Sequence, residues 1–352
     1  MSKVSYILGA GASYGSRKEP KVETFSSLSK VIIRGLPVLQ DFSDALNQLL
    51  GELEGINDYN IAKKYITSNV LNELLKVSEE YPTIDTYAKM LYVTKRINEY
   101  EKFKVHLSLF FLIWQKNHKH DLRYDSFISS LIDIETCKFP PLTILSWNYD
   151  MQFEMSYSKY INEECALWEI WDKLNVYCKS NRTLKYNAND PFAFFKLNGS
   201  AMFHANEMKT DSLRSSLQDV LWSDISEETF WKKIYNLLEN SQYKNFIPKY
   251  NNELSYAWEN KGKEKLLSHI AQRVADCEIL VVIGYSFPYV NREIDRHIFD
   301  SMPNLKCIYI QDKKSKVIEE RINAIFEYLH KPTPTLVPKD DIDQFFLPNE
   351  LG

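Results

Sequence analysis

The chain has 352 residues, of which 43 are basic and 47 are acidic, so its formal net charge is −4. Apolar residues make up 44 % and charged residues 26 %, which is ordinary for a folded protein and excludes a disordered or collagen-like chain. Because there is no global excess of positive charge, we expect no direct binding of nucleic acid. Only 10 residues are glycine, so the positions of the glycines are informative.

The cysteines and the apolar runs bear on metal binding and on the compartment. The five cysteines are Cys137, Cys165, Cys178, Cys277 and Cys307. No two of them have CxxC spacing, so we expect neither a disulfide framework nor a metal site. The longest apolar run, residues 109–114, is far shorter than the ~20 residues that span a bilayer, and the N-terminus lacks the apolar region of a signal peptide. We therefore expect a cytoplasmic protein without a membrane anchor.

Short apolar segments alternate with helical patterns along the chain. The segments 4–8, 142–146, 193–197, 279–283 and 305–310 are rich in β-branched or aromatic residues, as buried parallel strands are. Helices are predicted over residues 61–77, 87–114, 226–238, 264–275, 292–299 and 316–328, with Ser226 as an N-cap. This alternation predicts an α/β fold with a Rossmann-like parallel sheet.

The spacing of the predicted strands is uneven. Residues 1–330 are expected to form one domain whose sheet is interrupted by large helical insertions at about 38–135 and 205–275. The remaining segment, 331–352, contains four prolines. Because proline cannot continue a helix, this segment is predicted to be an extended C-terminal arm.

A glycine-rich loop follows the first predicted strand directly, with the sequence Gly9-Ala10-Gly11-Ala12-Ser13. At a strand-to-helix junction such a loop lets the backbone approach a pyrophosphate closely. A tight turn without a ligand is the alternative. The third position of the usual GxGxxG fingerprint is Tyr14, and no acidic second strand follows, so an ordinary dehydrogenase does not fit.

Polar and small residues also follow the other predicted strands. They are Asn148, Asp150, Asn198, Gly284, Tyr285, Ser286 and Asp312. The carboxyl ends of parallel strands meet at one edge of the sheet, where open α/β sheets bind their ligands. For Asp150, an Asx turn that starts the next helix is the alternative.

In this order, the motifs GAGAS, NYD, KLNGS and GYSFP resemble the sirtuin-like NAD-binding proteins. The similarity is greatest to the bacterial branch whose members hydrolyse NAD in antiphage defence. It rests on four short motifs between residues 4 and 312 and does not cover the helical insertions. The resemblance implies an NAD glycohydrolase that cleaves NAD to nicotinamide and ADP-ribose and acts as an NAD-depleting effector.

The resemblance also implies roles for individual residues. The loop from Gly9 to Ser13, including Ala10, Gly11 and Ala12, would hold the pyrophosphate, and Pro37 would lie near a flexible cofactor loop. Asn148 would orient the attacking water, and Asp150 would line the carboxamide pocket. The residues implied on the adenosine side are Gly284, Tyr285, Ser286 and Asp312.

Two features depart from the family pattern. The four-cysteine zinc module of protein deacylases is missing, which disfavours peptide deacylation. Asn198 occupies the position of the family's catalytic histidine, and an amide cannot take up a proton near pH 7. Because nicotinamide leaves as a neutral molecule, catalysis with Asn148, Asp150 and Asn198 remains the leading hypothesis. The alternatives are a catalytically silent NAD- or nucleotide-binding scaffold and a conventional reductase.

The aromatic-rich segment 103–114 is either internal core or a contact surface between subunits, and the expectation about partners depends on the second alternative. A toxic effector without a sensor module needs a restraint. The sequence therefore predicts a homo-oligomer, or a complex with a partner defence protein, formed through the inserted helices.

Overall fold

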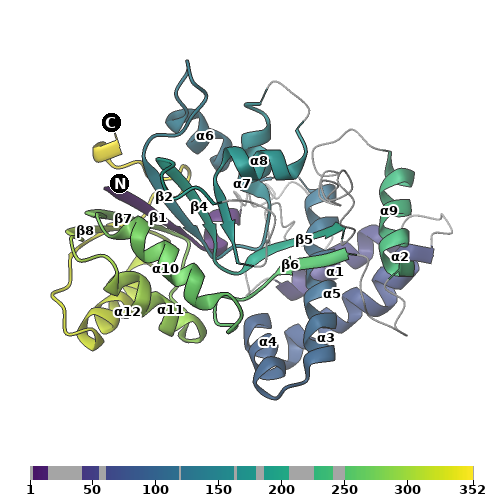
Figure 1. Ribbon diagram of the computed structural model, residues 1–352. Coiled ribbons are helices and arrows are strands. Elements are labelled where there is room, and N and C mark those ends of the chain that lie inside the picture. Colours follow the sequence, from purple (N-terminus) through teal and green to yellow (C-terminus); the bar gives the residue numbers. More distant parts are fainter. Residues whose placement is uncertain are drawn as a thin grey trace, which may run out of the picture.

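The computed structural model describes residues 3–14, 42–54, 61–118, 120–161, 165–179, 186–205, 226–240 and 250–351. These residues contain a sheet of seven parallel strands in the order β3-β4-β2-β1-β7-β8-β9 (Figure 1). The strands are β1 (Val4–Leu8), β2 (Leu142–Ser146), β3 (Val176–Cys178), β4 (Phe192–Lys196), β7 (Ile279–Ile283), β8 (Cys307–Gln311) and β9 (Thr335–Lys339). The predicted α/β fold with a Rossmann-like sheet is confirmed.

The central strands are buried along their whole length. Such strands carry apolar side chains on both faces, because helices cover both faces of a parallel sheet. β1, β2 and β7 have the predicted bounds, whereas β4 starts and ends one residue earlier than predicted. β8 is shorter than the predicted 305–310 at its start and one residue longer at its end.

Helices cover both faces of the sheet (Figure 1). One face packs against α6 (Leu122–Leu131), α7 (Gln152–Ser158) and α8 (Leu167–Lys173). The other face packs against α10 (Lys263–Val274), α11 (Arg292–Asp300) and α12 (Ser315–Tyr328). Tyr6 and Ile7 illustrate the alternation along β1, because Tyr6 belongs to the first layer and Ile7 to the second.

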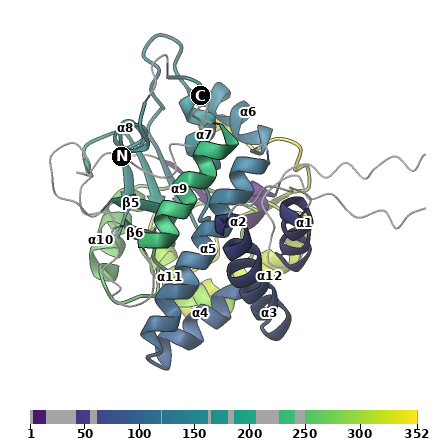
Figure 2. The ribbon, with the colours of Figure 1, turned by 90° about the vertical axis from the view of Figure 1, so that its right-hand side faces the viewer.

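A third apolar cluster lies in the inserted segments, and Figure 2 faces its helices. It combines α1 (Phe42–Glu54), α2 (Ile61–Tyr65), α3 (Asn72–Glu80), α4 (Ile84–Val93), α5 (Ile97–Asn117) and α9 (Glu227–Asn240). A π-helical turn, Ile66–Leu71, joins α2 to α3. The antiparallel strands β5 (Gly199–Ala205) and β6 (Tyr250–Leu254) pack against α5 and connect this cluster to the end of β4. Ser226 caps α9 as predicted, since its Oγ accepts from the Thr229 amide at 3.2 Å.

The predicted helix 87–114 is divided in the structure. α4 ends at Val93 and α5 begins at Ile97, and Lys95 between them has a φ of 59°. The aromatic side chains of α5, including Phe103 and Trp114, are buried inside the inserted cluster. The segment 103–114 therefore forms internal core, which is the alternative considered from the sequence, and the homo-oligomer or partner complex stays a prediction.

The C-terminal segment is not a free arm. Its strand β9 pairs in parallel with β8 at the edge of the sheet, where Pro338 is tolerated because an edge strand leaves one side unpaired. Beyond it, Gln311 Nε2 donates to the carbonyl oxygen of Gln344 at 2.6 Å, and the Phe345 ring is buried against the sheet. In the part of the chain described, no helix is both long and apolar enough to cross a membrane.

Candidate functional site

A cavity lies at the carboxyl ends of β1, β2, β4 and β7. The empty space at this site is about 760 Å³, a volume that includes open solvent. In the sheet, β2 and β4 lie on one side of β1, and β7 and β8 lie on the other side. The strand order therefore reverses at β1. Open α/β sheets bind ligands at this position. Of the predicted residues, those lining the cavity are Ala10, Ser13, Asn148, Asp150, Asn198, Gly284, Tyr285 and Ser286.

The glycines of the loop after β1 allow a close contact between two loops. The amide of Gly9 donates to the carbonyl of Ile283, and that of Gly11 to the carbonyl of Gly284, both at 3.0 Å. A Cβ built on Gly11 would lie 2.7 Å from Gly284 Cα, and Gly284 itself has a φ of 60°. Neither Gly9 nor Gly11, nor Ala12, is among the residues lining the cavity. The glycine pattern is thus explained by packing against Gly284, while Ala10 and Ser13 face the cavity.

Asn148 joins the end of β2 to this loop. Its Nδ2 donates to the Gly9 carbonyl at 2.9 Å and to Ser13 Oγ at 3.0 Å. The Ser13 hydroxyl is also 2.9 Å from the Tyr124 hydroxyl on α6. Because both of these bonds use Nδ2, Oδ1 is the atom of the Asn148 amide that can accept from a ligand.

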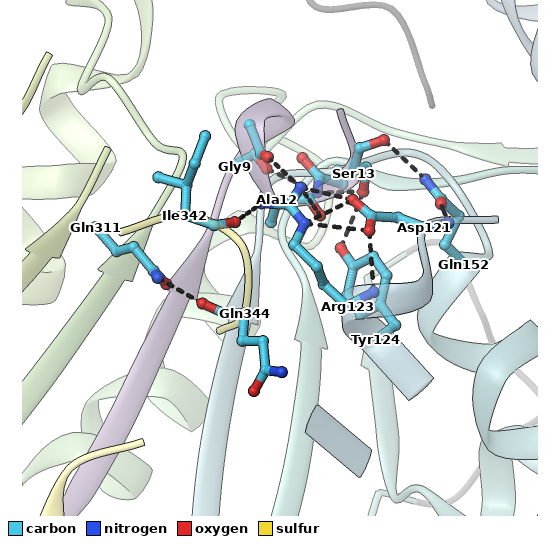
Figure 3. A network of polar contacts seen from close by, with 12 residues as sticks. Gly9, Ala12, Ser13, Asp121, Arg123, Tyr124, Gln152, Gln311, Ile342 and Gln344 are labelled. Carbon is cyan, nitrogen blue, oxygen red and sulfur yellow. Dashed lines mark hydrogen bonds and ion pairs between the residues drawn. The ribbon is translucent and has the colours of Figure 1, made fainter. Parts of the chain in front are cut away.

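Arg123 on α6 holds the other side of the same loop (Figure 3). Its guanidinium donates to the carbonyl oxygens of Gly11 and Ala12 at 3.0 and 3.2 Å and is paired with Asp121 at 2.5 Å. It also donates to the carbonyl of Ile342 at 3.0 Å, in the C-terminal segment. The loop is therefore fixed by side chains from β2, from α6 and, through Arg123, from the end of the chain.

Asp150 is buried and has two roles. Its Oδ1 accepts from the Gln152 amide at 3.0 Å, so the Asx turn considered from the sequence is present at the start of α7. Its side chain also lines the cavity. Burial raises the pKa of the Asp150 carboxyl, and the nearby Lys196 ammonium and the Ser13 hydroxyl oppose this rise.

A buried ion pair lies beneath Asp150. Lys196 at the end of β4 is 1 % exposed and Glu154 on α7 is 0 % exposed, and their charged atoms are 2.8 Å apart. Lys196 Nζ also donates to the Asp150 carbonyl at 2.6 Å. Glu154 Oε1 accepts a further bond from Trp171 Nε1 at 3.1 Å. The Lys196 ammonium therefore fixes the backbone of Asp150 from below the cavity.

Asn198 lines the cavity, but both polar atoms of its amide are bonded to backbone groups. Nδ2 donates to the Trp147 carbonyl at 3.2 Å, and Oδ1 accepts from the Ala257 amide at 3.1 Å. The side chain thus joins the end of β2 to the segment that follows β6. This arrangement gives Asn198 a positioning role, because each of its two polar atoms holds a backbone group, and one N–H and one lone pair of the amide are left over.

An aromatic pair forms part of the wall. The rings of Trp147 and Tyr285 stack with centroids 5.2 Å apart and an interplanar angle of 9°. The Tyr285 hydroxyl donates to the buried Asp295 carboxyl at 3.0 Å and accepts from Asn291 Nδ2 at 3.3 Å. The residues after β7 therefore offer a rigid apolar surface beside the hydroxyl of Ser286, which also lines the cavity.

Sequence reasoning missed Asp85, a carboxyl that the inserted helix α4 brings to the same cavity. Tyr149, which lies between Asn148 and Asp150 in the chain, donates its hydroxyl proton to Asp85 Oδ1. Burial raises the pKa of Asp85 to about 6, against the lowering effect of the Tyr149 bond. No local motif marks Asp85, because its partner Tyr149 is distant in the sequence.

Two further predicted residues lie elsewhere. Asp312 is not among the residues lining the cavity, and its Oδ1 accepts from the Lys314 amide at 2.7 Å just before α12. Pro37 lies outside the described residues. Among the residues whose placement is described, no group of three or more His, Cys, Asp or Glu side chains could hold a metal ion.

No known family model matches the chain, and no curated protein matches it either. The interpretation of the site therefore depends on the geometry of the cavity and on the motifs that surround it.

Proposed function

We propose that the protein binds NAD in this cavity and hydrolyses the bond between nicotinamide and ribose, releasing nicotinamide and ADP-ribose. The observation that carries the proposal is the cavity at the point where the strand order reverses, with Ser13, Asn148, Asp150 and Ser286 in its wall. Nucleotides bind at such points in α/β sheets. The order of the four motifs and their likeness to sirtuin-like proteins support the choice of NAD among nucleotides.

The chemistry needs few groups from the protein. Cleavage passes through an oxocarbenium-like state in which positive charge develops on the ribose. In the proposed arrangement the Asp150 carboxylate stabilises this charge, and Asn148 Oδ1 accepts a hydrogen bond from the attacking water. The water oxygen bonds to the ribose carbon, nicotinamide departs with the bonding electron pair as a neutral molecule, and the water's proton passes to a carboxylate and then to solvent.

Asn198 favours a second candidate function. An amide cannot take up a proton near pH 7, so this position supplies no base. A scaffold that binds NAD or a related nucleotide without turnover would keep the cavity and lack the reaction. The physiological role as an NAD-depleting defence effector, with an oligomer or partner that restrains it, belongs to the hydrolase proposal and rests on the motif resemblance.

The test is release of nicotinamide from NAD by the purified protein, with NAD binding measured in parallel by calorimetry. The native protein is expected to release nicotinamide, and Asn148→Ala is expected to reduce the rate by roughly 100-fold or more. Asn304→Ala serves as the control, because Asn304 is an exposed amide whose Nδ2 bonds to the Ala275 carbonyl. NAD binding without release above the Asn148→Ala background would leave only the scaffold, and absence of binding would reject both functions.

A further inference from the structure

The inserted helices form one wall of the cavity. Phe42 of α1, Ile84 and Asp85 of α4 and Phe111 of α5 all line it. Three of these four side chains are apolar, so Asp85 is the charged group that this wall brings to the ligand space. The sheet edge supplies the opposite, mostly polar side.

Asp85 is not needed for the helix that carries it. It lies in the first turn of α4, but the helix is capped by Thr83, whose Oγ1 accepts from the Thr86 amide at 3.0 Å. Among the residues that the structure describes, Tyr149 donates the one hydrogen bond to the Asp85 carboxyl, at Oδ1. An asparagine would also accept that bond, through its carbonyl oxygen. A structural role alone therefore gives no reason for a carboxyl at this position.

Keeping a carboxyl there is costly. Asp85 is 8 % exposed, and no cation among the described residues stabilises the ionised form of its carboxyl. Burying a carboxylate without a positively charged partner disfavours its ionised form, and such groups cluster at functional sites. The phenols of Tyr149, Tyr256 and Tyr285 lie near Asp85, and burial keeps their own pKa values well above the usual range, so they remain neutral donors.

We propose that Asp85 binds a ribose of the ligand by accepting a hydrogen bond from its 2′-hydroxyl through Oδ2. In dinucleotide-binding folds this contact is commonly made by a carboxylate that follows the second strand of the sheet. Here Asp312, the residue expected on the ribose side, does not line the cavity, and one oxygen of Asp150 is bonded to the Gln152 amide. The sheet edge brings one carboxylate to the cavity, Asp150, which the proposed reaction uses to stabilise charge, and the helical insertion supplies a second one, Asp85. This inference rests on the proposed function only in taking NAD as the ligand.

The experiment compares three proteins and two kinds of ligand by calorimetry at pH 7.5. The proteins are the native chain, Asp85→Asn and Asp44→Asn, the last being the same change at an exposed carboxyl in the first turn of α1. The ligands are NAD and ADP-ribose, together with analogues in which one or the other ribose lacks its 2′-hydroxyl. Because Asp85→Asn keeps the acceptor for Tyr149, the variant is expected to fold.

Loss of a charge-assisted hydrogen bond is expected to weaken binding of NAD and ADP-ribose by about tenfold or more in Asp85→Asn and to leave Asp44→Asn unchanged. The native protein should bind one of the two deoxy analogues more weakly than the parent ligand by a similar factor. For that analogue, Asp85→Asn should weaken binding little further. Equal affinity of native and Asp85→Asn protein for NAD would overturn the inference and leave the NAD proposal standing. The inference would also be overturned if Asp85→Asn weakened the binding of both deoxy analogues as much as it weakens the binding of NAD.

The outcomes separate this inference from the proposed function. Binding of ADP-ribose without release of nicotinamide from NAD would reject the hydrolase and still measure the contribution of Asp85. If neither NAD nor ADP-ribose binds to the native protein, the function and the inference both fail.

Discussion

The side-chain amide of Asn148 donates a hydrogen bond to the carbonyl oxygen of Gly9, 2.9 Å away. The bond links the loops that follow two neighbouring strands, β1 and β2, although the residues are far apart in the sequence. On its other side the same loop contacts Gly284, which follows β7. The loop thus has a fixed shape before any ligand enters, as a preorganised binding site requires.

The close contact between Gly11 and Gly284 predicts that a side chain at residue 11 will be destabilising. A Cβ at Gly11 would lie 2.7 Å from Gly284 Cα, so one of the two loops must move. Gly11→Ala is expected to lower the free energy of unfolding by about 1–3 kcal/mol, in the range of overpacked cores, and Gly11→Val by more. Urea denaturation measures the change.

Gly51 provides the matched control for this prediction. It lies within α1, and no atom is within 4 Å of a Cβ built there. Gly51→Ala should stabilise the protein by roughly 0.5–1 kcal/mol, because alanine loses less conformational entropy in a helix. If Gly11→Ala behaved like Gly51→Ala, the contact with Gly284 would not determine the loop's sequence.

Strand prediction succeeded where one local signal was enough. β1, β2 and β7 are runs of buried apolar residues between strong boundaries, and their bounds were predicted correctly. β9 was missed because its residues are half-buried or exposed and include Pro338, which resembles a linker in the sequence. One helix was predicted over 87–114 because apolar residues recur with helical spacing on both sides of residues 94–96. In the structure the backbone turns at these three residues.

The candidate site was predictable for residues that follow strands, because topology places all strand ends at one edge. The role of each residue was less accessible. Asn198 has its two amide atoms bonded to Trp147 and Ala257, and no pattern near residue 198 reveals the second contact. Asp85 enters the cavity from an inserted helix, so only the tertiary packing of α4 brings it to Tyr149.

The bonds of Asn198 predict a structural effect for its replacement. Asn198→Ala leaves the buried amide of Ala257 and carbonyl of Trp147 without these partners, which is expected to lower the free energy of unfolding by about 1–3 kcal/mol. Asn198→His places a donor and an acceptor at different positions and should also destabilise the protein without accelerating nicotinamide release. Urea denaturation and the nicotinamide assay together measure both effects.

Asn304→Ala is again the control, since Asn304 is exposed and is expected to change stability by less than about 0.5 kcal/mol. A variant Asn198→His with native stability and faster nicotinamide release would contradict the positioning role. It would restore the interpretation of residue 198 as the site of a missing base.

The buried pair of Lys196 and Glu154 predicts a strong dependence between two substitutions. Lys196→Met leaves the Glu154 carboxylate buried without its cation and removes the bond to the Asp150 carbonyl, so a loss of roughly 3–5 kcal/mol is expected. Adding Glu154→Gln removes the uncompensated charge and keeps an acceptor for Trp171 Nε1. The double variant should therefore be more stable than Lys196→Met alone, and additive losses in urea denaturation would argue against the pair.

The raised pKa of Asp85 predicts how stability changes with pH. Its pKa is about 6 in the folded protein against a usual value of 3.8. Below pH 3.8 the carboxyl is protonated in both states, so burial costs nothing. Between about pH 4 and pH 6 the unfolded chain loses its proton first, so the contribution of Asp85 to the free energy of unfolding falls as pH rises through this window.

Asp85→Asn removes this titration and keeps the acceptor for the Tyr149 hydroxyl. At pH 7.5 the variant is expected to be more stable than the native protein by up to roughly 3 kcal/mol, the equivalent of about two pKa units. At pH 4 the two should be nearly equal. Asp44→Asn, at an exposed carboxyl, should change stability little at either pH. Urea denaturation at pH 4, 6 and 7.5 measures the difference. If the native protein were more stable than Asp85→Asn at pH 7.5, the carboxylate would stabilise the fold. If Asp85→Asn is more stable and also binds the ligand more weakly, the carboxylate contributes to ligand binding and not to stability, which is the expected result.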